Sequence, residues 1–402
     1  MSTMVWKGVT VSEQRQNFIE DYSLNYYSVR DLADRYSISR KTAHKWINRF
    51  EQSGQNGYHE LSRRPLSCPW QTEQDIIDLI VQLRSKHPSW GSKKLIHVLK
   101  KRHSQLELPS TSTTTRILQK ENLIKRHTHH KRAHPGCPQS VAKEPNEIWG
   151  ADYKGQFRLG NTQYCFPQTV SDLFTRFLLG CDSHPEISQD LTKQHFLILF
   201  DTFGLPRCIR TDNGVPFASC ALARLSVLSV WWIKLGIYPE LIEPGVPQQN
   251  GIHERIHRTM KRDATMPPGA NLAAQQRKFD HFRKEYNEQR PHEAIGMRTP
   301  SDIYHPSSRK MPSRIETYDY PSHFLVRLIS RCGTMRVISQ QVFVSTTLKE
   351  EYVGLEEIDD GVYDIFFCFY HIGRYDVRTN RIQDIISRVP TRYGQIDLAK
   401  RV

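Results

Sequence analysis

Apolar positions in the first third of the chain recur at the spacing of amphipathic helices. The pattern predicts three short helices within residues 10–52, two of which carry apolar residues at i, i+3, i+4 and i+7. Ser28 and Ser39 stand where N-caps belong, and Asp31 completes a capping box with Ser28. A very short turn around Ser37 joins the second and third helices, which indicates a helix-turn-helix. The two apolar faces consist of Val29, Leu32, Ala33 and Tyr36, and of Ala43, Trp46, Ile47 and Phe50.

The same pattern returns over residues 72–126. Thr72 and Asp75 have the spacing of a capping box. The Ser/Thr run at 110–115 is typical of a helix N-terminus, where polar side chains and free N–H groups can meet phosphates. We therefore expect a second helix-turn-helix. The apolar stripe of its first helix is Ile76, Leu79, Ile80 and Leu83.

Beyond residue 146 the pattern changes to apolar, aromatic runs bounded by turns. EIWGADYKG, TQYCFPQTVSDLF and RFLLGCDS predict three successive strands, and PRCIRTDNG predicts a fourth. Strands and helices in this order favour a mixed sheet covered by helices. After a linker rich in Pro, Ser and Arg, closely spaced β-runs from FLVRLIS to HIGRYDV predict a small barrel. Helices are expected over 188–203, 219–235, 251–263 and 271–289.

These elements define a multidomain α+β protein. We expect helix-turn-helix modules first, then an α/β core, then a small C-terminal domain resembling a β-barrel. The expected domains are 1–60, 70–130 (helix-turn-helix or winged-helix-like), 146–292 and 315–385.

The charge of the chain predicts a polyanionic partner. The 402 residues carry a formal net charge of +14, and residues 84–132 hold 13 Lys/Arg against 2 Asp/Glu. Nucleic acid is the expected partner, because each neutralised phosphate releases counterions. The alternative is a solvated basic surface. The eight cysteines are scattered, and we see neither a secretion signal nor a membrane-spanning run, which favours a reduced, intracellular protein.

Several side chains are candidates for DNA contact. The third helix presents donors suited to phosphate and guanine. The expected contacts are Arg40, Lys41, His44, Lys45 and Arg49 in the first module, Lys93, Lys94 and Arg116 in the second, and Asn213, Gln249, His257, Arg258 and Lys261 in the core.

The segment HTHHKRAHPGC at 127–137 could hold zinc through His127, His130, His134 and Cys137. It has no accompanying Cys-x-x-Cys pair, and prolines mark extended chain on both sides of Cys137. We therefore interpret it as a basic linker.

Three carboxylates are candidates for chemistry. Asp152 lies within the first strand among apolar neighbours, where an unpaired charge is costly. Asp212 follows the fourth strand, at the end where α/β sheets present functional groups. Glu254 lies opposite the Ile252–Ile256–Met260 face of its helix. Periodicity alone leaves five other carboxylates open, namely Asp172, Asp182, Asp201, Glu240 and Glu243.

WGADYKG, RTDNGVPFAS and EPGVPQQNGIHERIHRTMK resemble, in order, the three catalytic blocks of bacterial insertion-sequence transposases with a retroviral-integrase-type core. The gap of 41 residues between Asp212 and Glu254 is longer than is usual in retroviral integrases. The resemblance implies a ribonuclease-H-like core and an Asp152, Asp212, Glu254 triad that is both catalytic and metal-binding. It also implies that Lys261 contacts the DNA end.

The implied function is transposition. The protein would bind the terminal inverted repeats of a mobile element, hydrolyse a phosphodiester and transfer the 3′-OH to target DNA. Two Mg²⁺ ions, with Mn²⁺ as a substitute, would serve the triad. A homo-oligomer on double-stranded DNA, in the bacterial cytoplasm on the nucleoid and away from membranes, is expected. The alternatives are a non-catalytic DNA-binding regulator and a ribonuclease-H-type nuclease without strand transfer.

Overall fold

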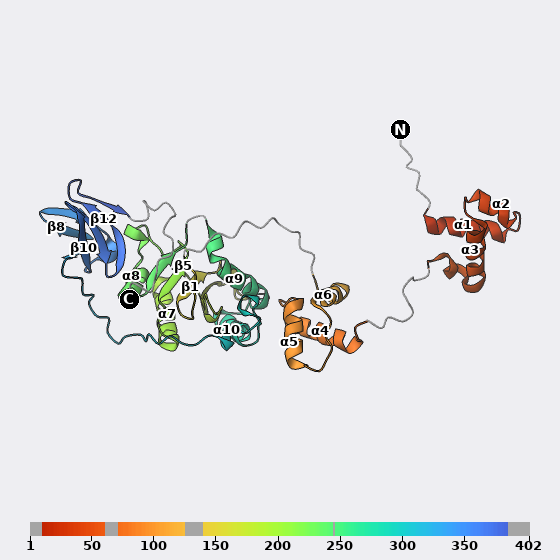
Figure 1. Cartoon of the computed structure of the whole chain (residues 1–402), viewed down its shortest axis with the longest axis horizontal. Helices are drawn as coiled ribbons and strands as arrows, with labels where there is room; N and C mark the ends of the chain where they lie inside the picture. The colour runs from red at the N-terminus through yellow and green to blue at the C-terminus, as the bar shows by residue number, and fades with distance from the viewer. Residues whose placement is uncertain (1–9, 61–70, 125–139, 244–245, 385–402) are drawn as a thin grey trace, which may run out of the picture. The chain divides into compact units, whose positions relative to one another are not determined.

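A computed structural model describes residues 10–60, 71–124, 140–243 and 246–384. The chain divides into two compact units, residues 1–71 and 72–402 (Figure 1). The histidine- and cysteine-bearing segment 127–137 lies outside the described residues. In the described part of the chain, no helix combines the length and apolar character that a bilayer crossing requires.

The first unit is a three-helix domain whose caps were predicted from sequence. Ser28 caps the second helix in a reciprocal box with Asp31, and Ser39 caps the third by accepting from the Thr42 N–H. Ser37 has φ of 50°, so a serine occupies the left-handed turn position that glycine usually fills. Its helices are α1 (Val11–Ser23), α2 (Val29–Arg35) and α3 (Arg40–Ser53), followed by a 3₁₀ turn, η1 (Gly54–Tyr58).

The second unit begins with three more helices around Ile80, Trp90 and Leu118. The predicted capping box at Thr72 is wrong, because the first helix starts at Gln74 with Glu73 at the N-cap and no side-chain cap. Ser110 does cap the last helix, as the Ser/Thr run predicted. These helices are α4 (Gln74–Lys86), α5 (Ser92–Arg102) and α6 (Thr111–Lys120).

A mixed sheet forms the centre of this unit. Its hydrogen-bonded strands follow the order β2-β3-β1-β5-β6, and β4, which lies off this path, also pairs with β3. β1 is antiparallel to β3 and parallel to β5, as a meander followed by crossovers requires. The strands are β1 (Ile148–Tyr153), β2 (Phe157–Arg158), β3 (Tyr164–Asp172), β4 (Leu178–His184), β5 (Cys208–Thr211) and β6 (Tyr238–Leu241).

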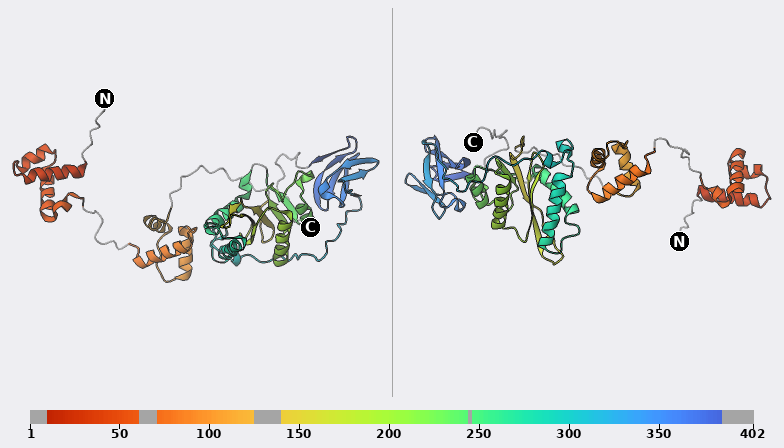
Figure 2. Two further views of the ribbon diagram at one scale, coloured as in Figure 1. Left: turned by 180° about the vertical axis from the view of Figure 1, so that it is seen from behind. Right: turned by 90° about the horizontal axis from the view of Figure 1, so that it is seen from below.

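Helices cover both faces of the sheet (Figure 2). α7 (Gln189–Phe203) and α8 (Val227–Lys234) bury one face around Trp149 and Phe200. α9 (Gly251–Asp263) and α10 (Leu272–Glu288) bury the other around Cys181 and Met260.

The helix predicted over 219–235 is shorter in the structure. Ala223 and Arg224 both have positive φ, so the chain breaks there and α8 starts afresh. Ser226 provides the new N-cap by accepting from the Ser229 N–H. The remaining 3₁₀ turns are η2 (Leu222–Arg224), η3 (Pro247–Asn250), η4 (Glu293–Ile295), η5 (Pro300–Asp302) and η6 (Thr346–Leu348).

The C-terminal part is β-structure, as predicted, but its ladders do not close into a barrel. Within the described residues, five strands form an open antiparallel sheet in the order β13-β12-β11-β10-β7, and β8 and β9 pair only with each other. The sheet packs on Ala223, in the turn before α8, and on Val230 of α8. The strands are β7 (Leu325–Leu328), β8 (Thr334–Val337), β9 (Gln340–Phe343), β10 (Tyr352–Asp359), β11 (Val362–Phe367), β12 (Tyr370–Asp376) and β13 (Arg381–Asp384).

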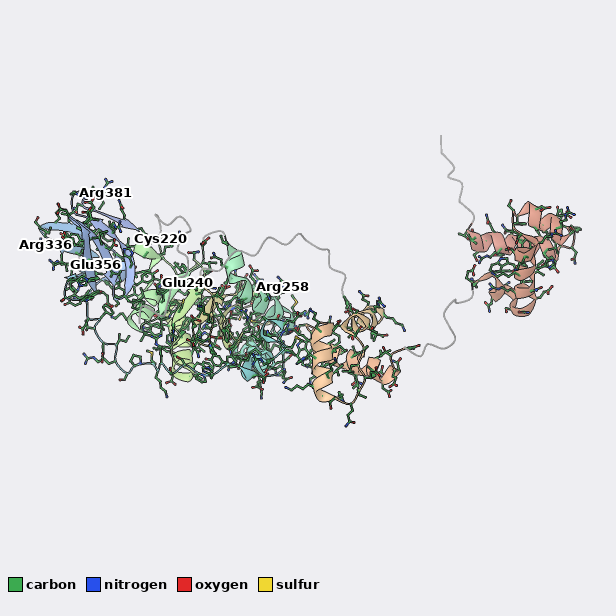
Figure 3. All side chains as sticks on the ribbon, viewed as in Figure 1. Cys220, Glu240, Arg258, Arg336, Glu356 and Arg381 are labelled. Atoms are coloured by element: carbon green, nitrogen blue, oxygen red, sulfur yellow. The ribbon has the colours of Figure 1, made fainter. Side chains whose placement is uncertain are left out.

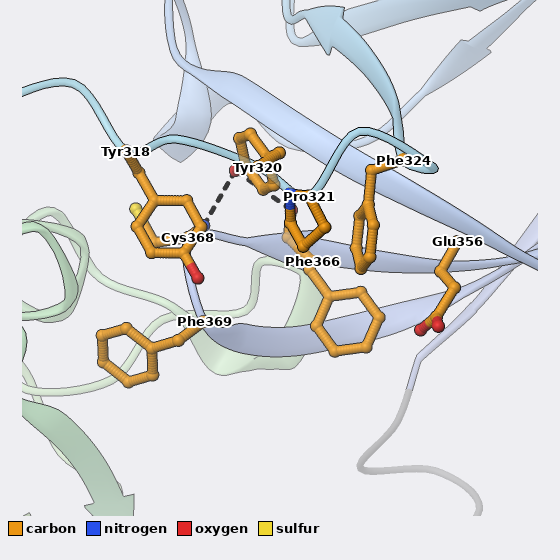
Figure 4. Close-up of a pocket in the computed structure, with 8 residues that line it drawn as sticks. All are labelled: Tyr318, Tyr320, Pro321, Phe324, Glu356, Phe366, Cys368 and Phe369. Atoms are coloured by element: carbon orange, nitrogen blue, oxygen red, sulfur yellow. Dashed lines mark hydrogen bonds between the residues drawn. The ribbon is translucent and has the colours of Figure 1, made fainter. Parts of the chain in front are cut away.

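An aromatic pocket of about 330 Å³ opens on this β-structure (Figure 4). Tyr318, Phe324, Phe366 and Phe369 form its walls, and the Glu356 carboxylate lies at one end. None of the three candidate catalytic carboxylates lines it.

Candidate active site

The order of the strands brings two of the predicted carboxylates to one edge of the sheet. β1 and β5 are parallel neighbours, and Ala151 pairs with Thr211. Asp152 follows Ala151 on β1, and Asp212 follows Thr211, the last residue of β5. The two aspartates therefore follow directly from paired positions.

Glu254 joins them from the first turn of α9. Ile256 and Met260 bury one side of α9, whereas Glu254 is exposed on the helix. Both Asp212 and Glu254 act on Asp152 as negative charges that disfavour its ionisation. The structure thus brings together all three carboxylates predicted from the sequence.

Asp152 is the most perturbed member of this group. Burial, then the charge of Asp212 and, less strongly, that of Glu254 raise its pKa to about 7. Hydrogen bonds from the Tyr153 backbone and from Asn250 oppose the shift without cancelling it. Two neighbouring carboxylates therefore disfavour ionised Asp152, and a cation bound beside it would offset that cost.

Hydrogen bonds hold the two aspartates in place. The Asn250 Nδ2 donates to Asp152 Oδ2 at 3.1 Å, and the Gly214 N–H donates to Asp212 Oδ1 at 3.2 Å. Burial raises the pKa of Asp212, and the Gly214 hydrogen bond lowers it. Asn250 is the N-cap residue of α9, yet its side chain caps nothing, because its amide is directed to Asp152. From the sequence we predicted the adjacent Gln249 as a DNA contact but did not select Asn250, although both belong to the PQQNG block.

Two histidines of α9 fasten the helix to the sheet beside Asp152. His253 is fully buried and lies 3.3 Å from Thr169 Oγ1 and 3.2 Å from Ser171 Oγ. His257 Nε2 lies 2.8 Å from Thr169 Oγ1, and its Nδ1 lies 3.8 Å from Asp152 Oδ2. Burial lowers the pKa of His257 to about 3 and that of His253 to about 4. Both are therefore neutral, so the His257–Asp152 contact is not an ion pair. Sequence reasoning did not identify this anchoring role.

The competing carboxylates have different environments. Asp172 is fully buried and accepts hydrogen bonds from Asn146 and Thr175. Glu240 pairs with Arg210 across β5 and β6, with both side chains buried (Figure 3). These are structural carboxylates with satisfied oxygens.

The remaining alternatives have other positions. Asp201 is exposed on α7. Glu243 follows Ile242, whose carbonyl accepts from Asn213 beside Asp212, and the Glu243 N–H donates to Gln249 Oε1 at 2.8 Å. Asp182 belongs to a separate cluster on β4.

Most of the predicted DNA contacts have exposed side chains. Arg258 and Lys261 are exposed on the same helix as Glu254 (Figure 3). Arg49 is half-buried against the Trp46 ring, and Lys93 is exposed but 3.1 Å from Glu293. The others that are exposed are Arg40, Lys41, His44, Lys45 and Arg116.

Three predicted contacts have hydrogen-bond partners within the protein, and a fourth is partly buried. Lys94 is half-buried, and burial together with the charge of Arg290 lowers its pKa to about 7. Asn213 donates to the Ile242 carbonyl and accepts from Arg224. Gln249 accepts from the Glu243 N–H, and His257 contacts Thr169. All four stay predictions, and for Asn213, Gln249 and His257 a DNA contact would have to replace an existing hydrogen bond.

A hollow of about 610 Å³ lies beside the start of α9. Arg176, Arg255 and Arg298 contribute to its lining, and Gly251 forms part of its wall. Its basic lining places positive charge close to the helix that carries Glu254.

Comparison with known families agrees with this organisation. The Integrase core domain family matches residues 235–300, which include Glu254 and both α9 and α10. Two Homeodomain-like domain families match residues 10–57 and 42–118. The matches therefore place two sequences similar to homeodomain-like domains before a sequence similar to an integrase core.

Insertion-element proteins are among the relatives. The chain is 25% identical to an uncharacterized 39.2 kDa protein of insertion element IS476 from Xanthomonas euvesicatoria, over 67% of this chain and 76% of that protein. It is 29% identical to an uncharacterized 31.7 kDa protein of insertion element IS407 from Burkholderia multivorans, over 40% of this chain and 55% of that protein. The resemblance to insertion-sequence transposases with an integrase-type core is confirmed by these matches.

Among solved structures, the integrase catalytic core domain of HTLV-2 in complex with magnesium is similar to this chain, with 18% identity and a TM-score of 0.33. The match covers 41% of this chain and 100% of that domain. A likeness this distant supports no further conclusion about the site.

Proposed function

We propose that this protein is a DNA transposase that cuts the ends of a mobile element and joins them to target DNA. The observation that carries the proposal is the environment of Asp152. Asp212 and Glu254 lie close enough to raise its pKa, and satisfied hydrogen bonds account for Asp172 and Glu240 instead. The insertion-element relatives and the homeodomain-like domains support the same function.

The donor set fits two Mg²⁺ ions. Asp152, Asp212 and Glu254 offer only carboxylate oxygens, which hard divalent cations prefer. The charges of Asp212 and Glu254 disfavour ionised Asp152, a cost that divalent charge would offset. We propose that these three residues hold the ions, with Mn²⁺ as a substitute. Bound there, the ions would supply charge stabilisation for the attacking and leaving oxygens of a phosphodiester.

The protein's own side chains position this site. Asn250 fixes one oxygen of Asp152, and the Gly214 N–H fixes one of Asp212. His253 and His257 hold α9 against β3, so that Glu254 stays beside the strand ends. A site held by buried neutral histidines keeps its geometry without adding positive charge that would compete with the cations.

DNA binding is proposed for two surfaces. The exposed donors of α3 would read the terminal inverted repeats, because a recognition helix presents such side chains to the major groove. Arg258 and Lys261, one and two turns after Glu254, would contact phosphates of the DNA end. Lys93 and Arg116 would add contacts from the second module. The C-terminal β-structure stays without an assigned role.

The assembly is also a proposal. Joining two ends of an element requires that both be held together, so we propose a homo-oligomer on paired DNA ends and on the target duplex. Its place of action would be the bacterial cytoplasm, on the nucleoid.

The test uses a supercoiled plasmid that carries the element's own ends, incubated with Mg²⁺. Asp152→Asn, Asp212→Asn and Glu254→Gln are each expected to bind the ends with unchanged affinity and to lose cleavage and joining by roughly 10³-fold or more. Asp201→Asn, which removes an exposed carboxylate of α7 in the same unit, is the matched control and should cut as wild type does.

Two results would reject this function in favour of the rival ones. Wild-type protein that binds the ends but leaves them uncut is a DNA-binding regulator. Wild-type protein that cleaves without ever joining ends is a nuclease. Triad variants that cut normally would show that the chemistry lies elsewhere.

A further inference from the structure

A second cluster of metal-ligating side chains lies on the opposite face of the central sheet. On β3, Thr169 pairs with Asp152 of β1, and the residue before it, Gln168, pairs with Asp182 of β4. Neighbouring residues of a strand point to opposite faces. Thr169 accordingly meets the α9 histidines, and Gln168 meets His195 of α7.

The cluster consists of Asp182, His184 and His195. One possible ligand atom from each lies within 4.8 Å of the others. His195 Nε2 lies 3.4 Å from Asp182 Oδ2. His195 and His184 are buried and Asp182 is partly exposed, so the group has a route to solvent through the carboxylate.

Gln168 determines which ring nitrogens are available. Its Oε1 lies 3.1 Å from His184 Nε2 and 3.0 Å from His195 Nδ1. A carboxamide oxygen only accepts, so both rings donate an N–H to it. The other nitrogen of each neutral ring is then a lone pair.

The hydrogen bonds of the protein do not explain the contact between His195 and Asp182. The side chain of His195 is 2% exposed, and its Nε2 has no hydrogen-bond partner in the described residues. That atom faces the carboxylate of Asp182. A lone pair directed at a carboxylate is unfavourable unless a cation lies between them.

We propose that Asp182, His184 and His195 bind one transition-metal ion, with Zn²⁺ as the best fit, separate from the carboxylate site. Two imidazoles and one carboxylate are a common three-ligand set for Zn²⁺, with water at the fourth position. Ligands about 2.0–2.2 Å from such an ion are roughly 3.4 Å apart, which is the His195–Asp182 separation. Gln168 supplies the outer hydrogen bonds that orient ligating histidines.

The ion would link elements that are distant in sequence. Asp182 and His184 belong to β4, the strand beside β3, and His195 belongs to α7. Charged groups of α10 near Asp182 are Arg283, which favours the ionised carboxylate, and Asp280, which disfavours it. Imidazole ligands favour Zn²⁺ over Mg²⁺, so the two sites would differ in the ion they select.

The test measures Zn²⁺ binding by full-length protein in an Asp152→Asn background. That change removes the carboxylate from the other group of nearby ligands, Asp152, His253 and His257. Alkylation of the exposed thiols of Cys220 and Cys332 removes two further ligands. The background also carries His127→Ala, His130→Ala and His134→Ala, because the segment 127–137 could hold zinc. We expect one Zn²⁺ per chain in competition with a chromophoric chelator, and a Co²⁺ absorption spectrum of nitrogen and oxygen ligands without a thiolate band.

Adding Asp182→Asn should raise the Zn²⁺ dissociation constant at least ~10-fold, whereas Asp280→Asn, on a neighbouring exposed carboxylate, should leave it unchanged. Should Asp182→Asn fail a circular-dichroism check of folding, His184→Gln serves instead. The proposal is overturned if the protein does not bind one Zn²⁺ per chain tightly, or if the Asp182 and Asp280 variants bind Zn²⁺ with equal affinity. That outcome would indicate a Gln168 amide turned to donate to both rings. Because cleavage is not measured, failure here leaves the transposase proposal standing.

Discussion

The two faces of the central sheet carry similar side chains in different states. On the α9 face, His253 and His257 have hydrogen-bond partners, and the unfavourable interaction is among carboxylates. On the α7 face, the carboxylate of Asp182 lies beside two buried histidines, and both His195 Nε2 and Gln168 Nε2 lack a hydrogen-bond partner in the described residues. The two proposed sites, one with only oxygen ligands and one with imidazoles, lie on opposite faces of one sheet and would select different cations.

On each face, one histidine packs over a glycine of the sheet: His253 over Gly150 and His195 over Gly180. A Cβ at Gly150 of β1 would come within 2.4 Å of His253 Nε2, and a Cβ at Gly180 of β4 within 2.3 Å of His195 Nε2. Atoms do not approach so closely, so each position depends on having no side chain. The two glycines therefore offer a matched pair of substitutions, one for each face.

Of the changes that test this comparison, Gly150→Ala has the largest expected effect. The methyl group would push His253, and with it α9 and Glu254, away from β1. A displacement of about 1 Å at a reacting centre costs on the order of 10²-fold in rate. Plasmid cleavage at saturating Mg²⁺ measures the loss, and Gly180→Ala is the control, expected to cut within about threefold of wild type. Equal losses in the two variants would mean that the faces are not independent.

A second prediction concerns the metal-free stability of the α9 face. The folded-state pKa of Asp152, about 7, lies above its unfolded value, so the native state holds this proton more tightly. Stability from this group is full at acidic pH and is lost as pH rises toward and through 7. In EDTA, Asp152→Asn should thus become more stable than wild type by roughly 2 kcal/mol at pH 8, and by much less at pH 5.

Denaturant titrations of both proteins at the two pH values measure this difference. Mg²⁺ should shrink it, because the cation stabilises the ionised wild-type site. Asp201→Asn, on an exposed carboxylate, should follow wild type at both pH values. A constant difference between the Asp152 variant and wild type from pH 5 to pH 8 would contradict the raised pKa.

Local patterns were sufficient to predict the α9 face. The helix over 251–263 has the bounds that were predicted, because its apolar stripe and polar face are both continuous. Asp152 and Asp212 were identified from their positions on single strands and from the quoted blocks. Strand β6 was not predicted, since Pro239 and Glu240 are unusual in strands. It is an edge strand, where proline is tolerated, and Glu240 is neutralised by Arg210.

The α7 face could not be predicted in this way. Its cluster depends on the register that pairs Gln168 with Asp182 and on the packing of His195 against Gly180. Register and packing are long-range properties, and Asp182 was only one of five equivalent alternatives in the sequence. The predicted barrel is not found for a similar reason. Whether β8 and β9 join the larger sheet depends on tertiary pairing.

The third prediction addresses the α7 face through Gly180→Ala. Displacing the His195 ring from a packed position should cost about 1–2 kcal/mol in the free energy of unfolding. The same change should weaken Zn²⁺ binding, so the melting-temperature increase that Zn²⁺ gives the wild type should be reduced. Thermal melts with and without one equivalent of Zn²⁺ provide both values. A variant that melts as wild type does under both conditions would show that His195 has room to move.

The smallest effect is expected away from both faces, on α3. Arg40 and Lys45 are exposed, and each should neutralise about one phosphate of the terminal repeat. Replacing either by Ala should therefore reduce the slope of log binding constant against log salt by about 0.9. Lys94→Ala, at a half-buried lysine that the sequence also predicted to touch DNA, should leave the slope nearly unchanged because Lys94 lies within the protein. Fluorescence anisotropy across a salt series measures all three slopes. A slope that drops for Lys94 but not for Arg40 or Lys45 would move the recognition surface from α3 to the second module, and would show that Lys94 leaves its site in the protein when DNA binds.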